Sequence, residues 1–463
     1  MKSINHTSWL YGIIFSMKEY TAGAVGNGRA DMKALMIGAA RSGIAAAKLL
    51  NEKGYEAIIT DLKEIPEKEE LEALGIRVYD GGHPDFLKEE KFDLIVKNPG
   101  IPDSAPFVKA MIDQGYFMYN ETEIAARYAP HYRFGAITGT NGKTTTTTLL
   151  GEMLKTLDPH NGAIGNNGFP VCETVRTLGD GDYTFAVEIA AFQLLGTKDF
   201  HPVVSVCTNL TPDHLNVFGT TDAYYKAKML VWQNQTEDDW FITNADDPNC
   251  MEYARDLPCR MLTFSLEKDA DICLKDGKVM MFGEELFDTA ILRIPGMHNI
   301  ANAMCAAAMA VKLGVSRENI VKVLPEFPGV EHRIQFITEK DGVRYYNDSK
   351  GTVPEATIVA LKAFPQPVIL LGGGYDKKTG FAAMKPYLDR IKYLIAFGAT
   401  KYQLKDLYQD AILVENLEEA VAKAHELAKD GDIVLLSPMC ASWDQFPSYE
   451  VRGHRFAELV KEL

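Results

Sequence analysis

Short apolar runs alternate with longer amphipathic stretches along most of the chain. The apolar runs are predicted to be buried β-strands, because they are short and end at glycine, proline or polar residues. The stretches between them carry the spacing of amphipathic helices. Strand and helix therefore alternate, which predicts parallel sheets and an α/β fold class. The predicted strands cover residues 33–37, 55–60, 92–97, 134–138, 183–189, 203–208, a strand ending at 346, 368–371, 394–397 and 433–436.

The segment 134–150 carries the clearest chemical signal. A predicted strand runs into the tight loop from Gly139 to Gly142, and a helix opens at Lys143. Free backbone N–H groups at such a helix N-terminus bind phosphate, Lys143 would reach the β- and γ-phosphates, and the Thr144 hydroxyl would touch Mg²⁺. The full P-loop pattern has a glycine where Ile137 stands, so an ordinary strand–helix turn remains the alternative.

A glycine turn also follows the first predicted strand. Glycines stand at 38 and 43, and Asp61 ends the next strand about where a ribose-binding acid would lie. A further strand ends at Asn98, Pro99 and Gly100. We interpret this part of the chain as a domain that holds a nucleotide-like group without hydride chemistry. A purely structural turn is the alternative, because the full dinucleotide fingerprint is missing.

Polar residues recur where the central strands end. Glu188 closes a buried strand, where a carboxylate needs a cation, and bound Mg²⁺ would supply one. His214 follows the next strand and is a second candidate metal ligand, although a lone histidine is more often a surface or capping residue. Lys226 and Lys228 lie on a predicted helix over 221–233, where either could be a solvated surface charge.

Two asparagines and three loops complete the residues selected by pattern. Asn299 and Asn302 lie three apart at the start of a small-residue helix, so both can face one ligand or cap that helix. Residues 325–330 have the composition of a linker. Beyond it, the α/β rhythm resumes with polar or glycine-rich loops at 347–352, 372–377 and 437–442. Ligands bind at such strand ends in open α/β sheets.

Size and charge limit the possible functions. A chain of 463 residues exceeds what one core supports, so two or three domains are expected. A net charge of −15 argues against nucleic acid or an anionic membrane as partner. The seven cysteines form no Cys-x-x-Cys and the chain has no apolar run of membrane-spanning length, which predicts a cytoplasmic protein without a zinc framework. Residues 1–31 are expected to be an N-terminal extension, with a poor signal peptide as the alternative.

These motifs occur together in one known family. From about Lys33 to its C-terminus the chain resembles the Mur ligases, the ATP-dependent amino-acid-adding enzymes of peptidoglycan synthesis. Within that family, the runs at 188–193, 347–352 and 435–446 resemble those of the members that add D-glutamate. The matching segments are 138–145, 209–214, 298–302, 331–333 and 347–350.

The resemblance implies a three-domain ligase. It implies a Rossmann-like UDP-substrate-binding domain at 32–121, a central P-loop ATPase-type domain at 122–329, and a Rossmann-like amino-acid-binding domain at 330–463. It also implies ATP, two Mg²⁺ sites, and UDP-N-acetylmuramoyl-L-alanine and D-glutamate as the substrates of a monomer. The expected reaction passes through an acyl phosphate.

Residue roles also follow from the resemblance. It implies that Lys143, Glu188, His214 and Lys228 are catalytic, with Thr144, Glu188, His214 and carbamylated Lys228 as metal ligands and Lys226 as the alternative carbamylated residue. The implied ATP contacts are Gly139, Thr140, Asn141, Gly142, Lys143, Thr144, Thr145, Asn299, Asn302, Arg333, Asp348 and Lys350. The implied UDP-substrate contacts are Arg41, Ser42, Asp61, Lys63, Asn98, Gly100 and Asn166. The implied D-glutamate contacts are Thr352, Lys377, Ser442 and Tyr449, with Lys378 as an alternative to Lys377.

The chain departs from the family pattern at three places. Ala190 and Ala191 replace two frequent serines, Gly351 replaces a usual alanine, and the segment 372–378 carries an extra residue. Two other functions remain open at this point. One is a folylpolyglutamate synthase-like ligase, and the other is a P-loop ATPase that acts as a switch.

Overall fold

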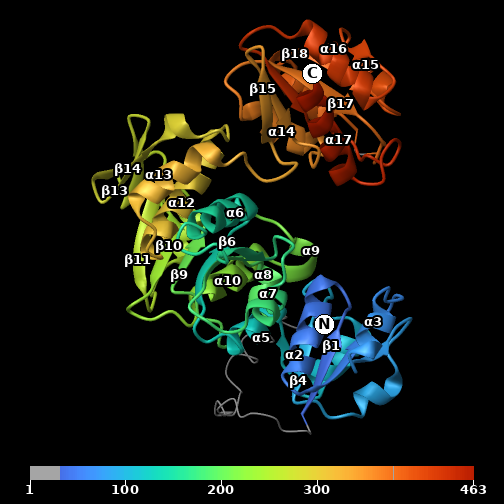
Figure 1. The fold of residues 1–463 in the computed structure, drawn as a ribbon, viewed down its shortest axis with the longest axis vertical. Coiled ribbons are helices and arrows are strands. Elements are labelled where there is room, and N and C mark those ends of the chain that lie inside the picture. Colours follow the sequence, from blue (N-terminus) through green and yellow to red (C-terminus); the bar gives the residue numbers. More distant parts are fainter. Residues whose placement is uncertain (1–31, 379) are drawn as a thin grey trace, which may run out of the picture.

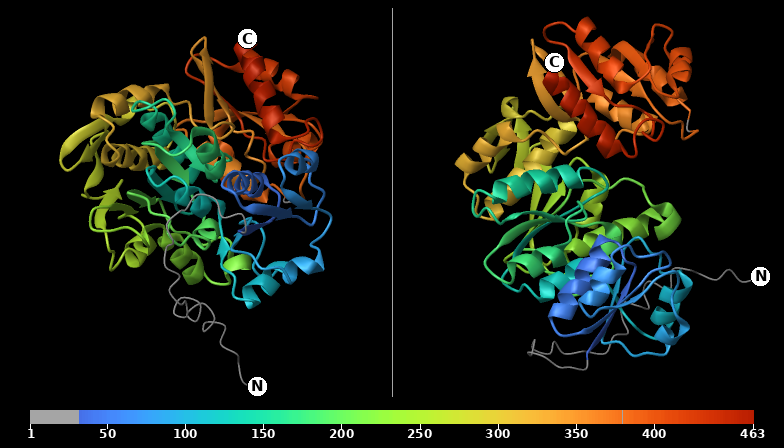
Figure 2. Two further views of the ribbon diagram at one scale, coloured as in Figure 1. Left: turned by 60° about the horizontal axis from the view of Figure 1, so that its bottom comes forward. Right: turned by 45° about the vertical axis from the view of Figure 1, so that its right-hand side comes forward.

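Three β-sheets with helices on their faces form the protein. The computed structural model describes residues 32–378 and 380–463. The sheets lie in three successive parts of the chain, which confirms the predicted α/β class and three-domain architecture (Figure 1). The three parts follow one another along the long axis of the molecule (Figure 2). The predicted N-terminal extension, residues 1–31, lies outside the described residues.

The first sheet has five parallel strands in the order β3-β2-β1-β4-β5. This order is that of a Rossmann-like fold, and it reverses between β1 and β4, where a ligand crevice is expected at the carboxyl ends of the strands. The elements are β1 (Lys33–Ile37), α2 (Arg41–Glu52), β2 (Glu56–Thr60), α3 (Lys68–Ala73), β3 (Arg77–Tyr79), η1 (Asp85–Lys88), β4 (Leu94–Lys97), α4 (Pro106–Asp113), β5 (Met118–Tyr119) and α5 (Glu121–Arg127).

The central sheet has nine strands in the order β14-β13-β12-β11-β10-β9-β6-β8-β7. The strands from β7 to β12 in this order pair in parallel, and β13 and β14 extend one edge through antiparallel pairs, so only β13 runs against the others. The elements are β6 (Arg133–Thr138), α6 (Lys143–Leu154), β7 (Gly162–Gly165), α7 (Val171–Leu178), β8 (Thr184–Glu188), α8 (Ala191–Leu194), β9 (Val204–Cys207), α9 (Leu215–Phe218), α10 (Thr221–Met229), η2 (Leu230–Trp232), β10 (Trp240–Asn244), α11 (Pro248–Tyr253), β11 (Arg260–Ser265), β12 (Ile272–Lys275), β13 (Lys278–Met281), β14 (Glu284–Asp288), η3 (Thr289–Ile291), α12 (Met297–Lys312), α13 (Arg317–Val323) and η4 (Leu324–Glu326).

The third sheet has six strands in the order β15-β16-β20-β17-β18-β19, and only β15 runs antiparallel to its neighbour. The elements are β15 (Gln335–Lys340), β16 (Val343–Asn347), α14 (Pro354–Lys362), β17 (Val368–Gly373), η5 (Ala382–Arg390), β18 (Ile391–Phe397), α15 (Lys401–Leu407), β19 (Ile412–Leu413), α16 (Leu417–Leu427), β20 (Ile433–Leu436) and α17 (Tyr449–Glu462). Each predicted strand is thus present, with ends that differ by a few residues at most.

The first two domains share one apolar core. Helix α2 packs against α7, and buried residues of both domains, from Ala34 and Leu50 to Ile124 and Phe185, form one continuous cluster. The C-terminal domain instead has its own clusters on the two faces of its sheet. Burial of apolar surface therefore holds the first two domains together, while the third is joined to them mainly through the chain near residue 330.

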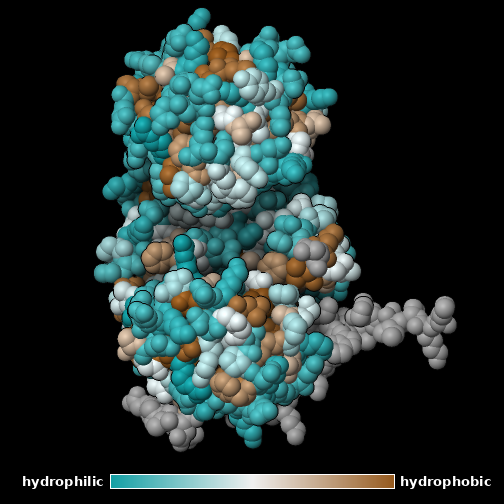
Figure 3. Space-filling view, turned by 90° about the vertical axis from the view of Figure 1, so that its right-hand side faces the viewer, coloured by the Kyte–Doolittle hydropathy of each residue, from teal (hydrophilic) through white to brown (hydrophobic). Residues whose placement is uncertain are grey.

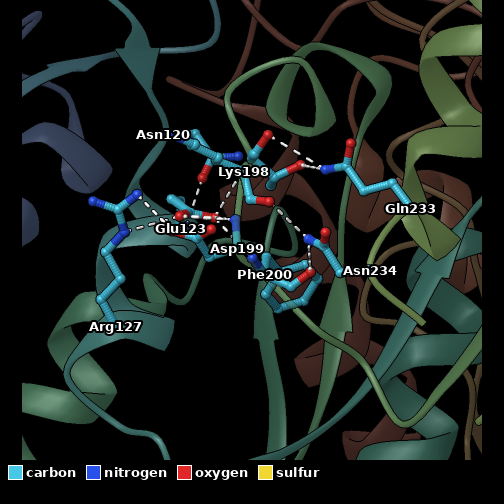
Figure 4. A network of polar contacts seen from close by, with 9 residues as sticks. Asn120, Glu123, Arg127, Lys198, Asp199, Phe200, Gln233 and Asn234 are labelled. Carbon is cyan, nitrogen blue, oxygen red and sulfur yellow. Dashed lines mark hydrogen bonds and ion pairs between the residues drawn. The ribbon is translucent and has the colours of Figure 1, made fainter. Parts of the chain in front are cut away.

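A polar network strengthens the junction of the first two domains (Figure 4). Glu123, on α5, has a fully buried side chain and accepts hydrogen bonds from the backbone N–H groups of residues 198–200 at 2.9–3.1 Å. Arg127 donates to Glu123 at 2.9 Å and also pairs with Asp199 at 3.0 Å. Asn120 caps α5 through the Glu123 N–H group. A buried carboxylate with this many donors fixes α5 on the loop before β9.

Candidate active site

The P-loop connects β6 to α6 and is held in shape by the loop that follows β9. Gly139 and Gly142 both adopt left-handed backbone angles, with φ of 131° and 85°. A Cβ atom on Gly139 would lie 2.0 Å from Thr208 Oγ1, so the close approach of the two loops requires glycine. The N–H groups of Thr140 and Asn141 donate to Asn209 at 2.9 Å. The 209–214 segment therefore supports the predicted phosphate cradle.

Lys143 lies folded over this loop at the start of α6. Its Nζ donates to the carbonyl oxygens of Gly139 and Thr140, both at 2.9 Å. Burial lowers the pKa of Lys143, while the nearby charge of Glu188 raises it. The amine is thus positioned between the backbone of the cradle and a buried carboxylate. Thr144 and Thr145 follow it in the first turn of α6.

Glu188 ends β8, the strand beside β6, and is 3% exposed. Its Oε1 accepts a hydrogen bond from Asn166 Nδ2 at 3.1 Å, while Oε2 has no hydrogen-bond partner. Burying a carboxylate oxygen without a partner is costly unless a cation binds it. An oxygen ligand of this kind suits Mg²⁺, so the donor set at the P-loop fits the ion.

Lys228 is buried against the P-loop. It is 1% exposed, and its Nζ donates to the Gly139 carbonyl at 2.6 Å and lies 4.4 Å from the centre of the Tyr224 ring. Burial, and next the charge of Lys143, lowers the pKa of Lys228 to about 7. Lys226 points elsewhere and pairs with Asp222 at 2.9 Å on the surface. The geometry thus favours Lys228 over Lys226.

His214 lies beside this lysine on a strained turn. Its φ is 52°, in the left-handed region that non-glycine residues rarely adopt. Its ring packs edge-on against Phe192 and Tyr224, with centroids 4.9 and 5.8 Å apart. Tyr224 therefore contacts both His214 and Lys228. Tyr224 is not among the predicted site residues, although its position four residues before Lys228 places both on one helix face.

Asn299 and Asn302 lie on the first two turns of α12 and are almost fully buried. Asn302 Nδ2 donates to Asn299 Oδ1 at 3.2 Å, and Asn299 Nδ2 donates to the Pro295 carbonyl at 2.7 Å. A Cβ atom on Gly142 would lie 2.3 Å from Asn302 Oδ1. The two amides share one side, as expected, and they pack against the P-loop. Their contact with the nucleotide remains a prediction.

Three of the residues predicted to contact ATP, Arg333, Asp348 and Lys350, lie in the C-terminal domain. Asp348, at the end of β16, is 5% exposed and accepts hydrogen bonds from the Ser437 hydroxyl at 2.6 Å and the Ile334 N–H at 3.3 Å. Burial raises the pKa of Asp348 to about 7. Burial lowers the pKa of Lys350, and the charge of the exposed Arg333 lowers it further and also acts on Lys143. This charge from the third domain therefore acts on the central site.

A second group in this domain gathers the predicted D-glutamate residues. Lys377 Nζ donates to Thr352 Oγ1 at 3.0 Å, whereas the Lys378 N–H donates to Asp376. The geometry therefore favours Lys377 over Lys378. Ser442 is 1% exposed, and its Oγ has no hydrogen-bond partner. Tyr449 begins α17 and lies under Lys350, with 5.6 Å between the ring centre and Nζ.

Arg452 holds the loops of this group together. It is completely buried and donates to the carbonyl and hydroxyl of Ser349 and to the Cys440 carbonyl, at 2.8–3.1 Å. Burial lowers the pKa of Arg452 to about 10, so it stays charged at neutral pH. This role could not be predicted, because Arg452 lies within an ordinary amphipathic helix.

The predicted UDP-substrate residues collect at the reversal point of the first sheet. Asn98 Nδ2 donates to Ser42 Oγ at 3.4 Å, and the Gly100 N–H donates to Asn98 Oδ1 at 2.9 Å. Asp61 accepts hydrogen bonds from the N–H groups of Ala39 and Lys63. The carboxylate of Asp61 is therefore already used to shape this turn, and a contact to a ribose remains a prediction.

Arg41 extends this group toward the central domain. One guanidinium nitrogen of Arg41 lies 3.5 Å from the position that a Cβ atom on Gly168 would take. Asn166 lies in the same loop, and it is exposed.

The space-filling view shows a polar hollow between the C-terminal lobe at the top and the two domains below it (Figure 3).

Comparisons with known proteins agree with this geometry. Residues 137–310 match the Mur ligase middle domain, and residues 332–440 match the glutamate ligase domain of Mur ligases. The UDP-N-acetylmuramoylalanine--D-glutamate ligase of Geobacillus kaustophilus is 42% identical, covering 93% of this chain and 98% of its own. The enzyme of that name from Lacticaseibacillus paracasei is also 42% identical, covering 94% of this chain and 96% of its own.

Solved structures with the same fold are more distant in sequence. The UDP-N-acetylmuramate-alanine ligase of Thermotoga maritima has a TM-score of 0.57 at 21% identity and covers 93% of this chain and 99% of its own. MurF from Acinetobacter baumannii has a TM-score of 0.58 at 17% identity and covers 92% of this chain and 94% of its own.

Among the helices of the described residues, none has the length and apolar character that a membrane span requires.

Proposed function

Because the chain belongs to the Mur ligase family, we propose that it is the ATP-dependent ligase that adds D-glutamate to UDP-N-acetylmuramoyl-L-alanine. The observation that carries this proposal is the similarity to D-glutamate ligases over almost the whole of both chains. This similarity includes the first domain, which a folate ligase or an ATPase switch would not need. The reaction belongs to peptidoglycan synthesis, and we place it in the cytoplasm.

The chemistry requires that a carboxylate be made into an acylating agent. The carboxylate of the L-alanyl group attacks the γ-phosphorus of ATP, ADP leaves, and an acyl phosphate forms. The P-loop N–H groups and Lys143 hold the phosphates where negative charge develops during this transfer. The amine of D-glutamate then attacks the acyl carbon, and phosphate leaves the tetrahedral intermediate. The products are ADP, phosphate and the UDP-linked dipeptide.

Thr144, Glu188 and His214 would hold Mg²⁺, which neutralises phosphate charge when bound. The support for this assignment is the buried, unpartnered Oε2 of Glu188 beside the phosphate cradle. His214 would serve a second ion. Glu188 ends β8, Thr144 lies in the first turn of α6 and His214 lies in the loop after β9, all at the carboxyl edge of the central sheet.

Lys228 is suited to become an anionic ligand of the second ion. With a pKa of about 7, much of its amine is neutral under physiological conditions. A neutral amine adds to CO₂, and the resulting carbamic acid loses a proton to give a carbamate. Tyr224 and the Gly139 carbonyl would then hold the modified side chain near the phosphates.

The first domain would bind the UDP-substrate, and the third domain would bind D-glutamate. We assign Arg41, Ser42, Asp61, Lys63, Asn98, Gly100 and Asn166 to the UDP-substrate. We assign Thr352, Lys377, Ser442 and Tyr449 to D-glutamate, since a cation with hydroxyl groups suits a dicarboxylate. Asn299, Asn302, Arg333, Asp348 and Lys350 would contact ATP. We propose domain limits at 32–121, 122–329 and 330–463, and a monomer that closes over its substrates.

Phosphate release tests the proposal directly. The assay contains ATP, Mg²⁺ and UDP-N-acetylmuramoyl-L-alanine, with D-glutamate added or withheld and with L-glutamate, L-alanine or glycine as substitutes. Release only with D-glutamate is expected. Release with another amino acid would move the enzyme within its family, and release from ATP alone would contradict a ligase. Lys143→Met is the negative control, and it should reduce release by about 10³-fold because the positive charge that stabilises the transferred phosphoryl group is lost.

A further inference from the structure

Two histidines and one glutamate gather where the chain enters the C-terminal domain. Glu331 Oε1 lies 2.9 Å from His454 Nε2 and 3.9 Å from His332 Nε2, and these three atoms lie within 4.8 Å of one another. His332 is 4% exposed, and its Nε2 has no hydrogen-bond partner. Two imidazoles and a carboxylate suit Zn²⁺ or Fe²⁺, so a metal site is the simplest interpretation.

The contacts at Nδ1, the other nitrogen of the His332 ring, contradict a metal site. Asn347 Nδ2 lies 3.0 Å from His332 Nδ1 and also donates to the Gly453 carbonyl at 3.0 Å. Asn347 Oδ1 accepts from the Ser349 N–H at 3.1 Å. These two contacts fix the direction of the amide, because turning it over would set donor against donor and acceptor against acceptor.

His332 Nδ1 must therefore accept a hydrogen bond from Asn347. Burial lowers the pKa of His332, so the ring is neutral, and its single proton lies on Nε2. A metal ion would have to bind Nε2, which carries the proton. In a metal-binding histidine the other ring nitrogen carries the proton and donates it to a partner. The ring thus acts as an acceptor toward the C-terminal domain.

This acceptor ring fixes the interdomain turn to the C-terminal domain. A Cβ atom on Gly453 would lie 2.2 Å from His332 Nδ1, so the ring packs directly on the backbone of α17. The Tyr449 ring meets it edge-on at 6.0 Å. The His332 carbonyl accepts from the Lys350 N–H at 3.1 Å. Through its side chain and its backbone, His332 attaches the turn to both β16 and α17.

Arg333 is the next residue on the same turn. Its N–H donates to the Val330 carbonyl at 3.0 Å, which closes the turn tightly. The charge of Arg333 acts on Lys143 in the P-loop and on Lys350 and Asp348 in the C-terminal domain. The location of the Arg333 side chain relative to the P-loop therefore depends on how firmly His332 holds the turn.

We propose that His332 is a positioning residue whose neutral ring, hydrogen-bonded to Asn347, fixes the turn so that Arg333 is presented to the phosphate site. This inference rests on the proposed function, because it takes Arg333 as an ATP contact. It predicts that His332 affects the ATP step through Arg333 and has little effect on D-glutamate binding.

Two isosteric variants test the hydrogen bond. In His332→Asn, the amide oxygen can take the place of the accepting Nδ1, and asparagine tolerates the left-handed φ of 61°. His332→Gln places its amide near Nε2 and provides no acceptor facing Asn347. We expect the glutamine variant to raise the KM for ATP by about tenfold while the KM for D-glutamate changes less than about twofold. The asparagine variant should stay within about threefold of the parent.

A double-mutant cycle tests the route through Arg333. If His332 acts through Arg333, then His332→Gln adds little to the loss caused by Arg333→Ala. Additive losses would overturn the proposal, and so would a glutamine variant with parental ATP kinetics. Both results are separate from a failure of the proposed function, which would appear as parental protein without D-glutamate-dependent phosphate release.

Zinc binding tests the rejected interpretation. His454→Ala is the control, since it removes one candidate ligand and leaves the His332–Asn347 hydrogen bond in place. We expect no stoichiometric zinc on the parental protein after dialysis and parental kinetics for His454→Ala. Zinc that binds the parental protein one to one and is lost in His454→Ala would overturn the assigned proton position.

Discussion

Asp348 is a carboxyl group that the C-terminal domain buries without an ion pair, and its replacement by asparagine gives a sharp prediction. Among the described residues, its contacts are the Ser437 hydroxyl and the Ile334 N–H. In Asp348→Asn the amide oxygen accepts from Ile334, and the amide nitrogen donates to Ser437 Oγ. The Ser437 proton can then turn to Thr357 Oγ1 at 2.7 Å. We expect a folded variant with satisfied hydrogen bonds.

The pKa of Asp348 sets the sign of the change in stability and the pH range over which it appears. The group ionises near 3.8 in the unfolded chain and near 7 in the folded protein, because burial disfavours its charge. Between these values the folded state holds the extra proton, so the free energy of unfolding falls as the pH rises from about 4 to 7 and stays low above it. Asparagine avoids this loss.

The magnitude follows from the same interval. About 3 pH units at about 1.36 kcal/mol each set a ceiling of about 4 kcal/mol for the gain in stability. The opposing charges of Arg333 and Arg452 and local relaxation reduce it. We expect Asp348→Asn to be more stable than the parent by about 1–3 kcal/mol at pH 8 and equal to it at pH 4.

Calorimetry at pH 4, 6 and 8 provides the assay, read on the transition of the C-terminal domain because the domains need not unfold together. Asp389→Asn, which changes an exposed aspartate of the same domain, is the matched control. Phosphate release by Asp348→Asn should fall by about tenfold or more, since a carboxylate kept at a cost in stability indicates use in the reaction. Equal melting of variant and parent at pH 8 would refute the reasoning. Equal stabilisation at pH 4 and pH 8 would assign the gain to packing instead.

Three further substitutions test other parts of the site and fold. Glu188→Gln should raise the Mg²⁺ concentration for half-maximal rate by about tenfold, because it neutralises the unpartnered Oε2, and an unchanged Mg²⁺ titration would contradict the assignment. Gly139→Ala should lower the free energy of unfolding by about 2–3 kcal/mol in urea, because a Cβ atom would meet Thr208 Oγ1 at 2.0 Å. Glu123→Gln should cost about 2–3 kcal/mol in the same assay while the KM for ATP changes less than about twofold, and a larger change in KM would connect this network to the active site.

The sequence predicted the strands well because a parallel sheet buries short apolar runs on both faces. Each predicted strand is present, and 33–37 and 433–436 match in both bounds. The glycine turn predicted after the first strand is followed directly by α2, which begins at Arg41. The strands β10 to β14 escaped prediction, and for β12 to β14 the reason is a partly exposed pattern without the continuous apolar runs of the core strands.

The candidate site was predictable by residue type but not by contact. Lys226 and Lys228 are two apart on one helix, and only the packing of α10 shows that Lys228 faces the P-loop. Arg452 carries no motif that would distinguish it from an ordinary helix residue, and Tyr224 is marked only by its spacing of four residues from Lys228. The proton on His332 depends on Asn347 and Gly453, which lie far apart in sequence and meet only in the folded domain.

The buried charges give these observations a common cause. Glu188 and Asp348 end strands, Lys228 and Arg452 lie on helices beside strand ends, and among the described residues none of the four forms an ion pair. Burying such a charge without an opposite charge lowers the stability of the free protein, and the hydrogen bonds of Arg452 and Asp348 offset part of that cost. Glu188 and a carbamylated Lys228 would suit metal ions and Asp348 would suit the ATP site, whereas Arg452 holds the loops of the C-terminal domain. Ligand binding should therefore restore stability that the free protein lacks, and the open hollow between the domains should become the most strongly stabilised region once it is filled.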